Sequence, residues 1–330
     1  MLPRPFPNEP VLDVRQLLAD GGVAALAELM RQRAGYVPQE RPLKDLVEAV
    51  SCGRPLLCKG EPGCGKSAFG KAMRFALNVP RFHLQCHEDL SSGDILYYWL
   101  NTAGSRTREN LILADPIAAY DYCISEGITP VLVVDEIDKT KKSKEFQLLE
   151  LFEERQATIP NLQPFNVVGI PETSDHLGPV VIVTANEERE LSEPMESRCI
   201  GTYFKSPTPA EEVAILRSRV PAVTEDVLRQ FVKMMHVIRH TCNVSRKPGI
   251  RESISFLSSV VRKDIITINW NVIDAHLGHI AKNESDGDNI YLKRMVLEDS
   301  VALPHDEIDE HVELAFATPN LPLQTYAQEL

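Results

Sequence analysis

The segment GEPGCGKS, from Gly60 to Ser67, has the residue types and spacing of a triphosphate-binding loop. It matches G-x-x-x-x-G-K-[ST], in which the backbone N–H groups of a glycine-rich turn face phosphate oxygens. Lys66 is expected to bridge the β- and γ-phosphates, and the Ser67 hydroxyl to ligate Mg²⁺. The helix predicted to begin near Lys66 directs the positive end of its dipole at the same charge. The expected binding residues for ATP are Gly60, Glu61, Pro62, Gly63, Cys64, Gly65, Lys66, Ser67 and Ala68.

Adjacent carboxylates close the apolar run VLVVDEID. Asp135 is expected to hold Mg²⁺ as a metal ligand, because the carboxyl end of a central parallel strand lies beside a phosphate loop. Glu136 is placed to polarise an attacking water, and a carboxylate base favours hydrolysis over phosphoryl transfer to a protein hydroxyl. An ordinary helix N-cap, such as Asp138, is the plainer interpretation, but it does not explain two carboxylates that end an apolar strand.

A further apolar run, VIVTAN, ends in Asn186. Its side-chain amide could orient the attacking water or contact the γ-phosphate. Asparagine also follows strands as an ordinary turn residue, so this position alone is a weak signal. Because it comes after the phosphate loop and the acidic pair in the chain, we favour a catalytic role.

These positions require a particular arrangement of helices and strands. Apolar runs predict strands over 55–60, 81–89, 129–138 and 178–187, and helical periodicity predicts helices over 43–53, 66–78 and 143–156. The segment 94–127 is predicted as a helix, a polar break and a second helix, and 157–172 as a β-hairpin. After Pro207 the patterns are helical only.

The fold class predicted from this order is α/β, with a parallel sheet between helices followed by a small all-helical domain. We expect a helical N-terminal extension over residues 1–35, a nucleotide-binding domain over 36–206 and a helical domain over 207–285. Residues 286–330 are expected to be an acidic extension or tail, either flexible or docked on a partner.

Composition narrows the class of protein. The 330 residues are 43% hydrophobic and 25% charged, as in ordinary globular proteins, and no apolar run is long enough to span a membrane. The N-terminus lacks a signal-peptide pattern, and the seven cysteines include no CxxC pair, so we expect a cytoplasmic protein without disulfides or a zinc site. The net charge of −12 makes nucleic acid an unexpected partner.

The order of these motifs resembles that of AAA+ P-loop ATPases. More narrowly it resembles the MoxR family, and within that family the carbon monoxide dehydrogenase maturation ATPases. The resemblance covers roughly residues 35–285 and rests on GYVPQERPL, GEPGCGKS, LQCHEDLSSGDILYYWLN, VLVVDEIDK, FEERQATIPNL, VVIVTANEERELSEPMESRCI and RKPGIRESISF. It implies an AAA+ core with a helical lid domain and a homo-oligomeric ring, commonly a hexamer. It also implies a protein partner with a von Willebrand factor A domain and a target that is remodelled, activated or supplied with a metal.

The resemblance assigns roles that spacing alone does not. Arg198, in SEPMESRC, corresponds to the arginine finger that reaches the γ-phosphate bound by the next subunit. Arg251, in KPGIRESISF, aligns with the sensor-2 arginine of the lid, and Arg246 and Lys247 are alternatives because the register is open there. A surface arginine at a helix end is the plainer interpretation of Arg198.

Three further features follow from the same resemblance. Gln85, after the second strand, could restrain Glu136 until the ring is loaded. The polar break near residue 104 and the predicted hairpin correspond to a helix-2 insert and a pre-sensor-1 hairpin, which face the ring pore in this branch. Ordinary surface excursions remain the alternative for both loops.

Two other functions use the same nucleotide site. One is a nucleic-acid motor resembling McrB, which the net charge disfavours. The other is a regulatory switch in a defence or stress module, whose ring changes a partner without threading it. The sequence does not separate this switch from remodelling, because both need the same residues.

Overall fold

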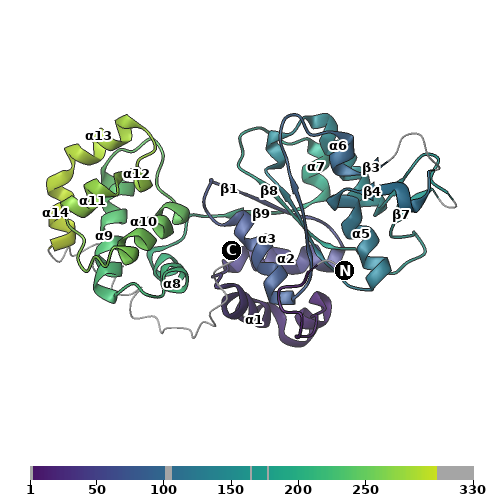
Figure 1. Cartoon of the computed structure of the whole chain (residues 1–330), viewed down its shortest axis with the longest axis horizontal. Helices are drawn as coiled ribbons and strands as arrows, with labels where there is room; N and C mark the ends of the chain where they lie inside the picture. The colour runs from purple at the N-terminus through teal and green to yellow at the C-terminus, as the bar shows by residue number, and fades with distance from the viewer. Residues whose placement is uncertain (1–2, 101–105, 164–165, 177, 303–330) are drawn as a thin grey trace. The chain divides into compact units, whose positions relative to one another are not determined.

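The computed structural model describes residues 3–100, 106–163, 166–176 and 178–302 (Figure 1). The chain divides into two compact units: the first holds the described residues up to Phe204 except Pro62–Cys64, and the second holds Pro62–Cys64 and the described residues from Lys205. Across the described ranges, no helix is both long enough and apolar enough to cross a membrane.

The first unit is built on a five-stranded parallel sheet with the order β2-β5-β8-β1-β9. Its strands are β1 (Leu56–Gly60), β2 (Arg81–Gln85), β5 (Val131–Asp135), β8 (Val180–Ala185) and β9 (Ile200–Phe204). Every residue of β5 and β8 is buried, as expected for central strands of a parallel sheet covered on both faces. Because the strands are parallel, their carboxyl ends share one edge, where Gln85 of β2 pairs with Asp135 of β5.

Helices cover both faces of this sheet (Figure 1). On one face, α3 (Lys66–Leu77) approaches β5 so closely that a Cβ at Gly70 would lie 2.7 Å from Val133, which explains the glycine. On the other face, α5 (Asp115–Glu126) and α6 (Lys142–Glu154) bury apolar side chains against Leu132 and Val134. The alternation of side chains along β5 therefore supplies both layers of the core.

The N-terminal segment is part of the first unit. Helix α1 (Val14–Ala34) packs against α3, and α2 (Glu40–Cys52) packs against β9. Asn78, fully buried after α3, bonds the backbone N and O of Phe6 at 2.8 Å each. The predicted N-terminal extension therefore packs on the core of its own chain.

Two antiparallel hairpins extend from the first unit. The predicted hairpin is confirmed, since β6 (Gln156–Thr158) pairs with β7 (Val167–Gly169). The helix predicted from residue 94 is wrong: the four-residue helix α4 (Ser92–Ile95) gives way to β3 (Tyr97–Trp99), which pairs with β4 (Leu111–Leu113). The three aromatic residues of β3 favour a strand. The polar break at 101–105 lies outside the described residues.

The described part of the second unit is helical, as predicted. Its helices are α8 (Pro209–Arg219), α9 (Glu225–Thr241), α10 (Ile250–Arg262), α11 (Trp270–Ala275), α12 (Leu277–Ile280), α13 (Glu284–Leu292) and α14 (Arg294–Ala302). Its core includes Phe231 and Phe256, whose ring centroids are 5.2 Å apart.

The helical unit extends past the boundary predicted at residue 285. That boundary falls inside α13, and Ile290 of α13 and Leu297 of α14 are fully buried in the core of the unit. The polar segment that resembles the start of a tail is instead a helix start, because the Asn283 side chain accepts a bond from the Asp286 amide. Residues 303–330 of the predicted tail lie outside the described residues.

Candidate nucleotide-binding and hydrolysis site

The predicted phosphate loop connects β1 to α3. Gly60, Gly63 and Gly65 have φ values of 142°, 85° and 100°, in the region that glycine adopts most easily. The Lys66 side chain turns back to the loop, where Nζ donates to the carbonyls of Gly60 at 2.7 Å and Glu61 at 2.9 Å. The residue is only 5% exposed. A buried ammonium at a glycine-rich turn suits a triphosphate, whose oxygens would replace these carbonyls as its partners.

Asp135 ends β5 at the same edge of the sheet and is 6% exposed. Its Oδ1 accepts a bond from Thr184 Oγ1 at 2.9 Å, and its Oδ2 lies 3.0 Å from His83 Nε2. Burial opposes the charged form, but hydrogen bonds from His83, Ser67 and Thr184 outweigh burial and lower the pKa of Asp135. An ionised carboxylate bonded to the Ser67 hydroxyl is an oxygen set that suits Mg²⁺.

Glu136 follows Asp135 with a left-handed backbone, φ 57°, which a non-glycine residue rarely adopts. Its amide donates to Thr184 Oγ1 at 2.9 Å. Its carboxylate is held from three directions: Oε1 accepts from Asn186 Nδ2 at 3.1 Å, and Oε2 accepts from Gln85 Nε2 and Lys139 Nζ at 2.9 Å each. The structure therefore brings both predicted neighbours, Gln85 and Asn186, to the predicted base.

Asp138 holds the segment after β8. It is 4% exposed, and its Oδ2 accepts the backbone amides of Asn186 and Glu188 at 2.9 Å each. This carboxylate therefore fixes the backbone that carries the Asn186 amide.

Arg198 does not contact these residues. It is the last residue of α7 (Glu193–Arg198), where its guanidinium pairs with Glu153 of α6 and donates to the Pro194 carbonyl at 3.4 Å. Arg54 in turn donates to the backbone carbonyls of Arg198, at 2.9 Å, and Ser197. The finger role of Arg198 stays a prediction.

The sensor-2 candidates belong to the second unit. Arg251 is an exposed residue in the first turn of α10, and Arg246 and Lys247 lie in the segment before that helix. Which of the three acts as sensor 2 also stays a prediction.

Sequence reasoning missed three side chains that contact the acidic pair: His83, Thr184 and Lys139. Thr184 was detectable as a polar residue inside an apolar strand. His83 lies two residues before Gln85, so strand alternation places both on one face. Lys139 lies three residues after Glu136, but that spacing does not by itself predict an ion pair in a short turn.

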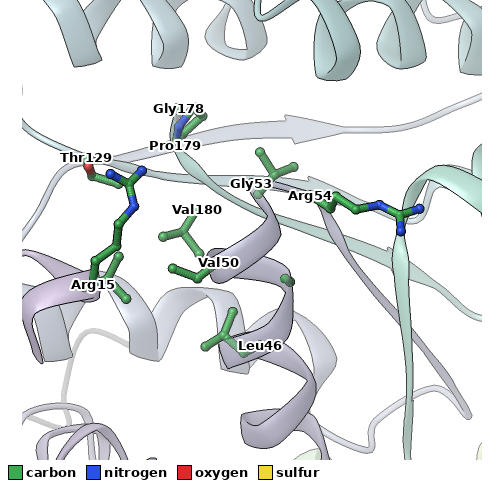
Figure 2. Close-up of a pocket in the computed structure, with 12 residues that line it drawn as sticks. Arg15, Leu46, Val50, Gly53, Arg54, Thr129, Gly178, Pro179 and Val180 are labelled. Carbon is green, nitrogen blue, oxygen red and sulfur yellow. The ribbon is translucent and has the colours of Figure 1, made fainter. Parts of the chain in front are cut away.

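A pocket lies at the opposite edge of the sheet, at the amino ends of the strands. Figure 2 shows Leu46, Val50 and Val180 among its lining residues, with Arg15 and Thr129 to one side. The guanidinium of Arg54 extends away from the pocket, consistent with its bonds to the end of α7. This mostly apolar pocket is distinct from the acidic pair.

Comparisons with known proteins agree with this geometry. Residues 55–199 match the family model of the AAA domain, dynein-related subfamily. Protein NorQ of Paracoccus denitrificans is 25% identical over 234 residues, which are 69% of this chain and 81% of NorQ. The denitrification regulatory protein NirQ of Stutzerimonas stutzeri is 46% identical over 49 residues, 15% of this chain and 18% of NirQ.

The gas vesicle ATPase GvpN of Haloferax mediterranei is 24% identical over 238 residues, 64% of this chain and 66% of GvpN. The AAA match spans the phosphate loop, the acidic pair and Asn186, and the parallel sheet brings these positions to one edge. The match of residues 55–199 to the AAA model, and the similarity of the chain to NorQ and GvpN, agree with the ATPase family that the motif order predicts.

Proposed function

We propose that this ATPase works as a cytoplasmic ring, commonly a hexamer in its family, that couples ATP hydrolysis to remodelling, activation or maturation of a protein partner. The observation that carries the proposal is the placement of Glu136. Its carboxylate is bonded to Asn186 and Gln85 and directly follows the buried Asp135. A base fixed in this way suits hydrolysis rather than nucleotide binding alone.

The chemistry proposed for this site is attack of water on the γ-phosphorus. The water oxygen bonds to the γ-phosphorus while Glu136 accepts a proton from that water. The bond between the γ-phosphorus and the bridging oxygen breaks, and this oxygen leaves with ADP. Asn186 orients that water, and Lys66 stabilises charge on the phosphate oxygens. Ser67 and Asp135 would hold Mg²⁺, which would supply positive charge at the phosphates.

Arg198 is proposed to act on the neighbouring subunit. Its side chain contacts Glu153 and Pro194 rather than the acidic pair of its own chain. An arginine supplied in trans is worth about 10³–10⁵ in rate, so hydrolysis would depend on assembly. Arg251 is proposed as the lid residue that senses the γ-phosphate, with Arg246 and Lys247 as alternatives.

A protein target fits the chain better than nucleic acid. The net charge is −12, and the two hairpins carry exposed apolar side chains, Tyr98 at 53% and Val167 at 43%. The hairpin regions are joined by a bond of 3.1 Å from the Gln163 amide to the Arg106 carbonyl. We propose that these hairpins contact the target, and that a von Willebrand factor A domain protein is the partner, as the family resemblance implies.

The test is hydrolysis by Arg198→Ala across a dilution series that spans assembly, followed by size-exclusion chromatography. We expect the variant to bind ATP and assemble normally but to hydrolyse it at least 10³-fold more slowly. Arg262→Ala, which removes an exposed arginine that bonds the Ser258 carbonyl of its own helix, is the matched control. Full turnover by a dilute monomer would contradict the shared site, and turnover stimulated by DNA would favour a nucleic-acid motor.

A further inference from the structure

A buried ion pair links two segments that the proposed chemistry does not use. Arg189, in the loop after β8, places Nη1 2.6 Å from Oε1 of Glu145 in α6. The Glu145 side chain is 0% exposed, and that of Arg189 is 27% exposed. A buried carboxylate is retained in a core only where charged and hydrogen-bonding partners satisfy it.

The arginine side of this pair holds the turn after Glu136. The guanidinium of Arg189 donates to four backbone carbonyls. Three belong to the turn after Glu136, those of Ile137 at 3.3 Å, Asp138 at 3.2 Å and Thr140 at 2.6 Å, and the fourth is that of the adjacent Glu190 at 2.8 Å. A planar fork of five N–H groups can satisfy this set, whereas a lysine ammonium cannot. The short helix η2 (Ile137–Lys139) is therefore fixed by a side chain from the loop that follows the neighbouring strand β8.

The glutamate side holds the start of α7. Glu145 Oε2 accepts the backbone amide of Ser192 at 2.8 Å, and Ser192 is the N-cap residue of α7. The Ser192 carbonyl accepts the Met195 amide at 2.9 Å, in the first turn of the helix. Since α7 is six residues long and ends at Arg198, its first turn helps to set the position of Arg198, together with the bond from Arg54 to the Arg198 carbonyl.

We infer that Arg189 and Glu145 are positioning residues that couple the turn beside Glu136 to the placement of Arg198 in the same chain. Loss of Arg189 would leave the buried Glu145 carboxylate without its counter-charge, so the pair ties the turn to α7. This inference rests on the proposed function, in which Arg198 acts in the site of the neighbouring subunit. The ion pair then links the nucleotide site of each chain to the arginine that the same chain supplies to its neighbour.

The experiment separates this role from any effect on the chain's own site. Chains carrying Glu136→Gln cannot hydrolyse but still offer Arg198, and chains carrying Arg198→Ala have an intact base but offer no finger. Mixing the two should restore hydrolysis at sites where Glu136 of an Arg198→Ala chain lies next to Arg198 of a Glu136→Gln chain. The test chain is then Glu136→Gln/Arg189→Ala, whose own site is already inactive, so any lost rescue reports only the finger.

We expect the test chain to rescue hydrolysis about tenfold or more below the Glu136→Gln chain, because small misplacements of a catalytic group are costly. Glu136→Gln/Arg262→Ala is the matched control and should rescue fully. ATP affinity and entry into mixed rings, measured by fluorescent nucleotide titration and native mass spectrometry, establish that each chain is folded. If Arg189→Ala does not fold, then Arg189→Lys and Glu145→Gln take its place, each expected to reduce rescue.

Two failures are distinguishable. If the Glu136→Gln chain itself gives no rescue, the result contradicts the shared site and therefore the proposed function. Full rescue by that chain, and equally full rescue by the folded Arg189 and Glu145 variants, would overturn the inference while leaving the proposed function intact.

Discussion

Asn186 and Glu136 are 50 residues apart in the chain and are joined by a hydrogen bond of 3.1 Å from Nδ2 to Oε1. Asn186 follows β8 and Glu136 follows β5, and these strands are neighbours in the sheet. The Asp138 carboxylate holds the backbone of Asn186 as well. The base and the amide proposed to orient the water are therefore arranged by the sheet itself.

Glu136→Gln should retain ATP and lose turnover. The amide keeps the size of the side chain but cannot accept the proton of water, and a positioned base contributes about 10²–10⁴ to the rate. Phosphate release at saturating ATP should fall by at least 100-fold, with unchanged nucleotide affinity. Glu188→Gln, an exposed carboxylate nearby, is the control. Near-normal turnover by Glu136→Gln would remove this residue as the base.

Gln85 and Asn186 should have opposite effects although both bond Glu136. Removing Gln85 frees Oε2 from one of its two bonds, so Gln85→Ala should raise basal hydrolysis roughly 2- to 10-fold, the value of one net hydrogen bond. Asn186→Ala should lower it by roughly 10- to 100-fold, because the water loses its orienting group.

Basal rates at saturating ATP without a partner measure both effects. Gln147→Ala, whose amide bonds Ser92 instead, is the matched control and should leave the rate unchanged. If Gln85→Ala slows hydrolysis as strongly as Asn186→Ala, Gln85 supports catalysis and does not restrain the base.

The residues that end the strands were predictable because their position depends on local pattern. An apolar run followed by a carboxylate or an amide identifies the carboxyl end of a buried parallel strand, and all such ends share one edge. Asp135, Glu136 and Asn186 could therefore be placed together without knowing the strand order.

The hairpin at Tyr97–Trp99 and the contacts of Arg189 were not predictable in this way. Apolar side chains in a short run satisfy a helix and a strand equally well, and pairing with Leu111–Leu113 decides between them. Arg189 bonds carbonyls about 50 residues away, and backbone carbonyls carry no sequence signature. Such contacts become visible only when the sheet order is known.

Arg239→Met should destabilise the helical unit strongly. Arg239 bonds both carboxylate oxygens of Glu212, at 2.6 and 2.9 Å, and the Pro248 carbonyl at 2.8 Å. Glu212 is 2% exposed, so loss of its partner leaves a buried unpaired charge. We expect the free energy of unfolding to fall by about 3–5 kcal/mol.

Urea unfolding followed by Trp270 fluorescence measures this change. The chain has two tryptophans, and a Trp99→Phe background leaves only the one in the helical unit. Arg262→Met removes an exposed arginine of the same unit and should change the free energy by less than about 0.5 kcal/mol. A loss below about 1 kcal/mol for Arg239→Met would mean that Glu212 is solvated or neutral.

Asp286 should make the stability of the helical unit depend on pH. Burial of its carboxylate raises the pKa, but bonds from the Ser245 backbone and hydroxyl, the Arg246 amide and the Asn283 side chain outweigh burial and lower the pKa of Asp286. A pKa lowered in the folded state stabilises the fold above the unfolded value, near 3.9. That contribution is lost as the pH falls through the lowered value.

The difference in unfolding free energy between the Trp99→Phe protein and its Asp286→Asn variant should therefore be largest near pH 7. It should shrink progressively once the pH falls below about 4, where protonation removes the charge that the amide variant already lacks. Asp288→Asn, an exposed position on the same helix, should give a small difference throughout. A difference for Asp286→Asn that stays constant from pH 7 to about 3 would show that the bonds to Ser245 do not depend on the charge of the carboxylate.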